Sequence, residues 1–513
     1  MTVTRTRVLI IAAAAVAAGL LATVAAPWPA RLGDVTTGDA ALAAEVRAAI
    51  DDPGGYRGLA VARIVNGQLR TAGVGERTTG PTGSPVAGLA GGGGEPVRPD
   101  TPFEIGSIGK TLTGMLLVDQ IADGHVDADT TLAQVLSDQE YGDPAVGELT
   151  LAELASHRSG LPRLAPASAT EAATAALAVL RGTDPYAGQD SEHLRTALNR
   201  SRVGDGYGEV HYSNYGMAVL GIALAHRAGV GFPELVEREI LGPLGMADTG
   251  YALDGADVAA DAAAGSTASG RTTDPWQGSG LAGAGIGLWS TAPDLAVLVS
   301  AVLDGSAPGA DAARPRFDAG PDSQIGYGWF TNTYDGREIT WHNGGTGGFS
   351  SYVGYDPATG DAVVVLGNTD RGVEPIGLAL LGVTVADDSP GAGPLMIGVT
   401  ILLLLSGAAT LALAVAGGAR RWWPAPDRLR LVTSALTTVS YLLIVHRLGT
   451  WLDVWAGWWA VAAGLAAGAA TAAASRWPEL PLIGSGRPWL RWTGAALTSA
   501  VTALVVLLTV LLA

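Results

Sequence analysis

Residues 101–114, TPFEIGSIGKTLTG, are the most informative stretch of this 513-residue chain. They place Ser107 three residues before Lys110, in a helix predicted from Gly106 to Gly124. Three residues are about one helical turn, so the lysine amine is expected beside the serine hydroxyl. A serine hydroxyl is a weak nucleophile that needs a base, and a lysine acts as one when burial lowers its pKa. The stretch therefore predicts a serine nucleophile with a lysine base.

The choice of basic residues supports this role. Thirty of the 31 basic residues are arginine, and Lys110 is the only lysine in the chain. Arginine stays protonated at any accessible pH and cannot accept a proton. A position that keeps lysine against this bias is one that needs an amine able to lose its proton.

A second motif, HYSNYG at residues 211–216, contains Tyr212 and Asn214. A phenol near the serine can pass a proton to a leaving group, and a carboxamide can hold both the lysine and a substrate amide. We therefore interpret Tyr212 as a proton relay and Asn214 as an amide-binding residue.

A third motif, ITWHNGGTGGFSS at residues 339–351, ends a predicted strand with four residues expected to bind substrate: His342, Asn343, Gly344 and Gly345. Glycines at a strand edge let a substrate backbone approach closely. The Gly345 N–H is one candidate donor to an oxyanion. The Ser107 N–H is the other, because it lies at a helix N-terminus whose dipole favours negative charge.

The strand pattern predicts an α+β fold. A strand at Leu59–Val65 meets the hairpin signal Asn66-Gly67 and a return strand from Gln68. Three more strands come late in the chain, at Glu338–His342, Phe349–Tyr355 and Ala362–Leu366. Helical patterns fill the interval, which indicates an antiparallel sheet closed by distant segments and an inserted helical lobe.

The order Ser-x-x-Lys, Tyr-x-Asn, His-x-Gly resembles the class C β-lactamase and penicillin-binding esterase superfamily. Three further stretches look like the same family: LTLAELASHRSGLPR (149–163), ILGPLGMADTGY (240–251) and GSGLAGAGIGLWSTAPDLAVL (278–298). The resemblance covers about Leu59 to Leu381. It implies a β-lactamase/transpeptidase-like fold, with the sheet flanked by helices and an all-helical lobe.

By this resemblance, an acyl-serine mechanism is carried by Ser107, Lys110, Tyr212 and Asn214, with no cofactor and no metal. His342 takes the place of the third-motif lysine. An imidazole is a poorer clamp for a substrate carboxylate than an ammonium, so esterase and peptidase activities stand beside β-lactam hydrolysis.

Several functions remain open at this point. The substrate is expected to be a small molecule or peptide with an amide or ester bond, with the cell wall as one source. D-amino-acid peptidase, carboxylesterase and β-lactamase all fit. The alternative class is a catalytically weak penicillin-binding or wall-sensing ectodomain that signals through membrane helices.

Rival chemistries have less support in the sequence. A nucleophile elbow needs glycine two residues before the serine, where Ile105 stands. His157 is set aside as a triad base, because the resemblance makes its segment structural. The seven histidines are scattered without a His-Glu-x-x-His motif, so no metal site is expected.

The two ends of the chain predict a membrane protein. Arg5 and Arg7 precede an uncharged run, Val8–Ala26, which reads as an export signal or an anchor. Four more apolar stretches follow residue 394: Leu395–Gly417, Leu431–Val445, Val454–Ala474 and Thr493–Ala513. The second is short for a span and needs its flanking arginines to reach the membrane surface.

The predicted domains follow from these runs. They are a signal or anchor at 1–30, a serine hydrolase domain at 31–386, a linker at 387–394 and a transmembrane region of about four helices at 395–513. The loops after the first and third stretches carry four and three arginines, whereas the loop after the second carries only Arg447. The positive-inside rule therefore predicts a multi-pass protein of the cell membrane with its hydrolase domain outside the cytoplasm.

Composition excludes other partners and chemistries. The formal net charge is −17, and the acids concentrate between the two apolar ends, so the surface repels nucleic acid. The chain has no cysteine, which excludes disulfides, thiol catalysis and thiolate metal sites.

Overall fold

A computed structural model describes residues 5–78, 94–253, 255–385, 392–416, 426–484 and 487–511. The chain divides into two compact units, each described by itself. The sheet unit contains the described residues 31–78 and 94–385, and the helix unit contains residues 5–30 and those from 392 onward. Residues 387–391 of the predicted linker lie outside the described residues.

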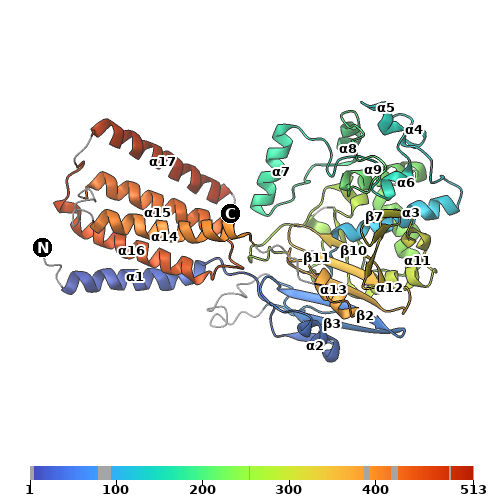
Figure 1. Cartoon of the computed structure of the whole chain (residues 1–513), viewed down its shortest axis with the longest axis horizontal. Coiled ribbons are helices and arrows are strands. Elements are labelled where there is room, and N and C mark those ends of the chain that lie inside the picture. Colours follow the sequence, from blue (N-terminus) through green and yellow to red (C-terminus); the bar gives the residue numbers. More distant parts are fainter. Residues whose placement is uncertain are drawn as a thin grey trace. The chain divides into compact units, whose positions relative to one another are not determined.

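The sheet unit is built on an antiparallel sheet (Figure 1). Over the described residues its nine strands follow the order β1-β3-β2-β12-β11-β10-β9-β8-β7. The bounds are β1 Thr36–Gly38, β2 Gly58–Val65, β3 Gln68–Gly75, β7 Phe317–Gly320, β8 Ser323–Ile325, β9 Phe330–Tyr334, β10 Arg337–Gly345, β11 Ser350–Tyr355 and β12 Ala362–Gly367. A small second sheet has the order β4-β6-β5, with bounds β4 Phe103–Glu104, β5 Gly250–Tyr251 and β6 Leu288–Ser290.

The predicted α+β fold is confirmed. β2 and β3 form the expected hairpin, in which φ is +52° at Asn66 and +74° at Gly67, the two positive values of a type I′ turn. β2 also pairs antiparallel with β12, which places Val61 opposite Val365. Strands from the two ends of the unit thus close the sheet across the helical insertion.

Helices cover both faces of the sheet and form the lobe (Figure 1). The bounds are α2 Ala40–Ala48, α3 Gly109–Ala122, α4 Leu132–Val135, α5 Pro144–Gly147, α6 Leu151–Ala155, α7 Ala169–Arg181, α8 Ser191–Leu198, α9 Asn214–Ala228, α10 Phe232–Val236, α11 Gly242–Leu244, α12 Ala292–Leu303 and α13 Glu374–Leu380, with 3₁₀ turns η2 Gly106–Ile108 and η5 Ser279–Ala284.

The sheet separates two hydrophobic cores because strand side chains alternate between faces. Along β2, Ala60 and Ala62 face the core shared with α3, α9 and α12, whereas Leu59 and Val61 face the core shared with α2 and α13. Burying a valine or leucine side chain contributes about 1.5–3 kcal/mol. The two cores therefore hold the sheet rigidly from both sides, and the first core supports the helix that carries the lysine.

Ser107 is positioned by a tight approach of two backbones. It lies in η2, which runs directly into α3. The preceding Gly106 has φ +52°, a left-handed value that favours glycine. At the end of β10, a Cβ on Gly344 would lie 2.0 Å from the carbonyl oxygen of Ile105. Glycine at position 344 therefore lets the third motif lie directly against the turn that carries the serine.

The helix unit contains α1 (Arg5–Ala25), α14 (Pro394–Ala416), α15 (Arg428–Leu448), α16 (Gly457–Arg476) and α17 (Pro488–Leu511). Among the described residues, these five single helices are long and apolar enough to cross a membrane. The short second apolar stretch lies inside α15, which continues into both of its charged flanks. The Asp427 carboxylate accepts a hydrogen bond from Arg430 N and caps α15, so its charged flanks are helical and the helix reaches 21 residues.

The N-terminal helix packs against α16 through small residues. A Cβ on Gly464 would lie 2.7 Å from the Ala15 carbonyl oxygen and 3.1 Å from Gly19 Cα, and a Cβ on Gly468 would lie 2.9 Å from Ala15 Cβ. Small residues allow such close helix pairing inside a membrane. α1 is therefore an integral member of the helix unit.

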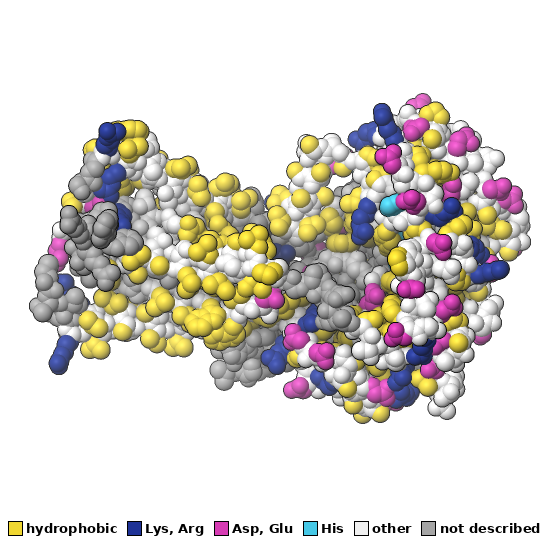
Figure 2. Space-filling model, viewed as in Figure 1, with side chains coloured by type: hydrophobic (Ala, Val, Ile, Leu, Met, Phe, Trp, Pro, Cys, Tyr) yellow, Lys and Arg dark blue, Asp and Glu magenta, His cyan; other side chains and the backbone are white. Residues whose placement is uncertain are grey.

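Arginines gather at one end of the helix unit. Arg7 lies 3.9 Å from Glu479, and the Arg428 guanidinium donates to Trp477 O at 3.2 Å. Arg491 pairs with Asp427 at the same end. Figure 2 shows dark blue side chains at this end and a mostly hydrophobic surface along the helices.

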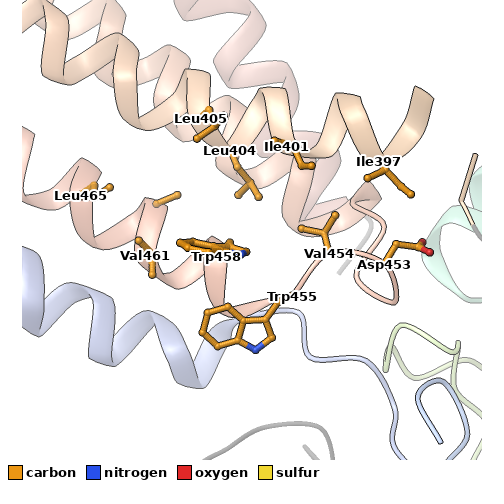
Figure 3. Close-up of a pocket in the computed structure, with 11 residues that line it drawn as sticks. Ile397, Ile401, Leu404, Leu405, Asp453, Val454, Trp455, Trp458, Val461 and Leu465 are labelled. Carbon is orange, nitrogen blue, oxygen red and sulfur yellow. The ribbon is translucent and has the colours of Figure 1, made fainter. Parts of the chain in front are cut away.

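An apolar groove of ≈ 450 Å³ runs between α14 and α16 (Figure 3). Ile401 and Leu405 line it from α14, and Trp458 and Leu465 line it from α16; Asp453 is the one ionisable residue of the lining. Such a surface suits contact with hydrocarbon.

Gly344→Ala tests the close approach behind the serine. Its Cβ would meet Ile105 O at 2.0 Å and Ser351 Oγ at 2.4 Å, so the backbone has to shift. Overpacking of this kind costs about 1–3 kcal/mol. We expect a lower melting temperature for the full chain in detergent. Gly345→Ala is the matched control, since a Cβ there meets nothing within 4 Å. Equal melting temperatures for the two variants would contradict the packing described.

Candidate active site

Ser107 and Lys110 lie side by side, as the helical spacing predicts. Lys110 Nζ is 2.7 Å from Ser107 Oγ and 2.8 Å from the carbonyl oxygen of Ala284. The Ala284 carbonyl comes from η5, in a stretch for which sequence reasoning had assigned no role. The next residue, Gly285, has φ +91°, and a Cβ there would lie 2.0 Å from Gly106 O. Glycine at 285 therefore brings the carbonyl within reach of the amine.

The surroundings of Lys110 favour a neutral amine. The side chain is fully buried, and this burial lowers the pKa of Lys110 well below 10.5. The positive charge of Arg163 lowers the pKa of Lys110 further. A neutral amine can donate one N–H to Ala284 O while its lone pair accepts the proton of the Ser107 hydroxyl. The geometry and the electrostatics thus suit a base at position 110.

Tyr212 is the second polar side chain, after Lys110, that contacts Ser107. Its ring centre lies 5.1 Å from Lys110 Nζ, and its hydroxyl hydrogen-bonds Ser107. Burial raises the pKa of Tyr212 to about 12, although the Ser107 hydrogen bond and the Arg163 charge act in the opposite direction. The phenol is therefore protonated near neutral pH and is suited to donate a proton.

Asn214 begins α9 beside the site. Its backbone N–H donates to the carbonyl oxygen of Arg163 at 3.0 Å. Its Oδ1 is buried and has no hydrogen-bond partner among the described residues. A buried carbonyl without a donor is costly, and a substrate N–H can satisfy it. Asn214 thus presents a buried hydrogen-bond acceptor that no described group satisfies.

The third motif divides between the two faces of the sheet. His342 is buried on the face of the first core, where burial lowers the pKa of His342 to about 3. The Nδ1–H of His342 donates to Asn343 O at 2.5 Å, and Nε2 has no partner among the described residues. The imidazole is therefore neutral and offers no positive charge to a substrate.

Asn343 lies on the opposite face, because consecutive strand residues alternate. Its Nδ2 donates to Glu374 on α13 at 2.9 Å, so its side chain points away from the serine. Gly345 is exposed, and its backbone N lies 3.1 Å from the position of a Cβ on Gly106. The Gly345 N–H is therefore next to the Ser107 turn, and the N–H groups at the start of that turn have no partner within the helix.

Glu104 is a buried acid that sequence reasoning missed. Its carboxyl accepts from Thr346 Oγ1 at 3.1 Å and from Trp276 N at 3.2 Å. Burial raises the pKa of Glu104 to about 8, although these two bonds lower it, so the group is mostly protonated at neutral pH. It ties the loops at 276 and 346 to the strand before Ser107. An acid inside the apolar PFEIG stretch was the available signal.

His157 is joined to the second motif by hydrogen bonds and a ring contact. Its Nδ1 accepts from Ser213 N at 3.2 Å, and its carbonyl oxygen accepts from His211 N at 2.8 Å. Its ring centre lies 4.5 Å from that of Tyr212. The residue holds φ +57°, an unusual value for a side chain other than glycine. The segment that contains His157 therefore supports the position of Tyr212. Burial lowers the pKa of His157 well below 6.5.

Within the described ranges, no cluster of three or more His, Asp or Glu side chains could hold a metal ion. The groups in contact at the site are the Ser107 hydroxyl, the Lys110 amine and the Tyr212 phenol. This set suits nucleophilic attack on a carbonyl with proton transfer between side chains.

The chain matches a sequence model of the Beta-lactamase family over residues 45–382. It belongs to this family of serine hydrolases. A class C β-lactamase from Rhodobacter sphaeroides has the same fold, with a TM-score of 0.53 and 22% identity over 67% of this chain and 99% of that chain.

Two curated relatives are named for different substrates. The D-alanyl-D-alanine-carboxypeptidase/endopeptidase AmpH of Escherichia coli is 30% identical over 167 residues, which are 31% of this chain and 39% of AmpH. Unguisins hydrolase ungD' of Aspergillus campestris is 26% identical over 56% of each chain. The matches thus span about two fifths to just over half of these relatives.

Lys110→Arg tests the base. The variant keeps a positive charge and roughly the length, but guanidinium cannot accept a proton near neutral pH. General-base catalysis typically contributes about 10²–10⁴-fold, so we expect at least that loss in acylation rate. In the wild type, acylation should fall as the pH drops through the lowered pKa of Lys110, since protonation removes the lone pair.

The measurement is the rate of serine labelling by a fluorophosphonate against pH, with melting temperature recorded in parallel. Near wild-type acylation by Lys110→Arg would show that the lysine only positions the serine.

Proposed function

We propose that this protein is an extracytoplasmic serine hydrolase that cleaves an amide or ester through an acyl-serine intermediate. The observation that carries the proposal is the 2.7 Å contact between Ser107 Oγ and a buried amine whose pKa is lowered by its surroundings. A merely structural lysine has no need of this dry, charge-disfavouring position.

In the proposed reaction, the Ser107 proton passes to Lys110 as Oγ attacks the substrate carbonyl carbon. The N–H groups of Ser107 and Gly345 stabilise the oxyanion of the tetrahedral intermediate. Tyr212, protonated near neutral pH, gives its proton to the leaving nitrogen or oxygen and recovers one from Lys110. Water then attacks the acyl ester by the reverse sequence and releases the acid.

An amide substrate has stronger support than an ester substrate. Asn214 Oδ1 is a buried acceptor with no partner among the described residues, which suits the N–H of an amide substrate. AmpH, which is similar over part of this chain, is named for D-alanyl-D-alanine cleavage. We therefore place D-amino-acid peptidase ahead of carboxylesterase and β-lactamase.

Ser107→Ala tests the nucleophile. We expect it to abolish covalent labelling by a fluorophosphonate or penicillin probe while the melting temperature stays close to that of the wild type. Labelling mapped by mass spectrometry to another serine would overturn the assignment. Labelling of the wild type without turnover of any amide or ester would favour the alternative, a penicillin-binding or wall-sensing ectodomain.

We also propose that the helix unit crosses the cell membrane with its arginine-rich end in the cytoplasm. Arg7 of α1, Arg428 of α15, Arg476 of α16 and Arg491 of α17 share that end, and only Arg447 lies at the opposite end of α15, which agrees with the positive-inside rule. The close contact between Ala15 and Gly464 supports α1 as a retained fifth span instead of a cleaved signal.

Reporter fusions test this topology. A reporter after Ala513 should behave as external and one inserted near Pro426 as cytoplasmic. The mature chain should keep Arg5 and Arg7, as read by N-terminal mass spectrometry. The reverse reporter pattern would overturn the orientation, and a mature chain starting beyond Ala26 would overturn the retained span.

A further inference from the structure

The third motif leaves the site without a cation for a substrate carboxylate. His342 is neutral, and Asn343 points to Glu374 across the sheet. Burial lowers the pKa of the first-motif lysine, which favours its neutral form. A substrate that carries a carboxylate, as peptides with a free C-terminus do, therefore needs a positive charge from elsewhere.

Arg163 supplies a positive charge at this site. Its guanidinium carbon lies 5.2 Å from the centre of the Tyr212 ring, and Lys110 Nζ lies 5.1 Å from the same ring centre. The Arg163 charge also acts on Tyr186 and His157. Arg163 thus faces the catalytic groups from the side of the second motif.

The backbone of Arg163 is fixed to that motif. Its carbonyl oxygen accepts from Asn214 N at 3.0 Å and from Tyr215 N at 3.2 Å. The preceding Pro162 carbonyl accepts from Ser213 Oγ at 2.7 Å. Because this backbone is anchored, the guanidinium stays within reach of the Tyr212 ring.

The guanidinium itself is open to a ligand. Arg163 is exposed, and among the described residues no carboxylate or carbonyl pairs with it. Guanidinium binds carboxylates through two parallel N–H donors, which adds geometry to charge.

We propose that Arg163 binds the carboxylate of the substrate and selects anionic substrates, foremost peptides with a free C-terminal carboxylate. The inference rests on the proposed function, because it assigns the specificity of the same site. Asn214 would bind the amide N–H and Arg163 the carboxylate, with the scissile carbonyl at Ser107.

Binding separates this inference from catalysis. In a Ser107→Ala background, the full chain in detergent is titrated with acetyl-D-alanyl-D-alanine and with its C-terminal amide by calorimetry. We expect Arg163→Gln to weaken binding of the carboxylate peptide at least ~10-fold more than binding of the amide peptide. Loss of a charge-assisted hydrogen bond has about this effect. Arg163→Lys should recover part of the preference for the carboxylate peptide over the amide peptide. Arg202→Gln, which removes another exposed arginine of the same lobe, should keep it.

Each other outcome overturns the inference. Equal loss for both peptides would make Arg163 a structural residue, and no loss would place the anion elsewhere. Failure of the carboxylate peptide to bind any variant would exclude this substrate class. In the wild-type background, Ser107 labelling without an Arg163-dependent preference would contradict the inference while leaving the proposed hydrolase intact.

Discussion

The contact between the buried Lys110 amine and the Ser107 hydroxyl is the constraint on which the rest of the site depends. A lysine inside a protein is costly while it is charged, so its burial shifts the balance to the neutral base that the reaction needs. The second acceptor, Ala284 O, fixes the amine without adding a negative charge that would hold its proton. Both the glycines around the serine turn and the core behind α3 keep this arrangement dry and close.

The remaining groups reach the serine from distant parts of the chain. The loop at 157–163 and the segment at 211–215 are joined by backbone and side-chain hydrogen bonds, which hold Tyr212 and Asn214 in place. The end of β10 approaches from the sheet, where Gly344 allows contact with Ile105. The site therefore lies where the helical lobe meets the sheet, and neither part forms it alone.

The fold followed from local sequence signals. The Asn66-Gly67 turn set the hairpin, and the late run of strands required partners that only the early strands could supply. The pairing of Ser107 with Lys110 was also predictable, because helical spacing places residues three apart side by side.

Other features depend on tertiary burial, which local pattern does not encode. The sequence pattern does not predict that Ala284 O contacts the Lys110 amine or that burial raises the pKa of Glu104. It also does not predict the contact between Arg163 and the Tyr212 ring. The apolar run of the second membrane stretch is short, and the helix of its charged flanks depends on the Asp427 cap, which hydropathy does not show. The third motif predicts that His342 and Asn343 both bind substrate. The two side chains lie on opposite faces of the sheet, because consecutive strand residues alternate.

The central claim is that Lys110 is neutral when the enzyme acts, and the chain offers a direct way to measure this. Because Lys110 is the only lysine, labelling with ¹³C-lysine gives one Cε signal by NMR, which Lys110→Arg removes. We expect this signal to titrate well below the 10.5 of an ordinary lysine. Titration at or above 10.5 would mean that the amine stays charged at neutral pH, and would contradict its role as the base.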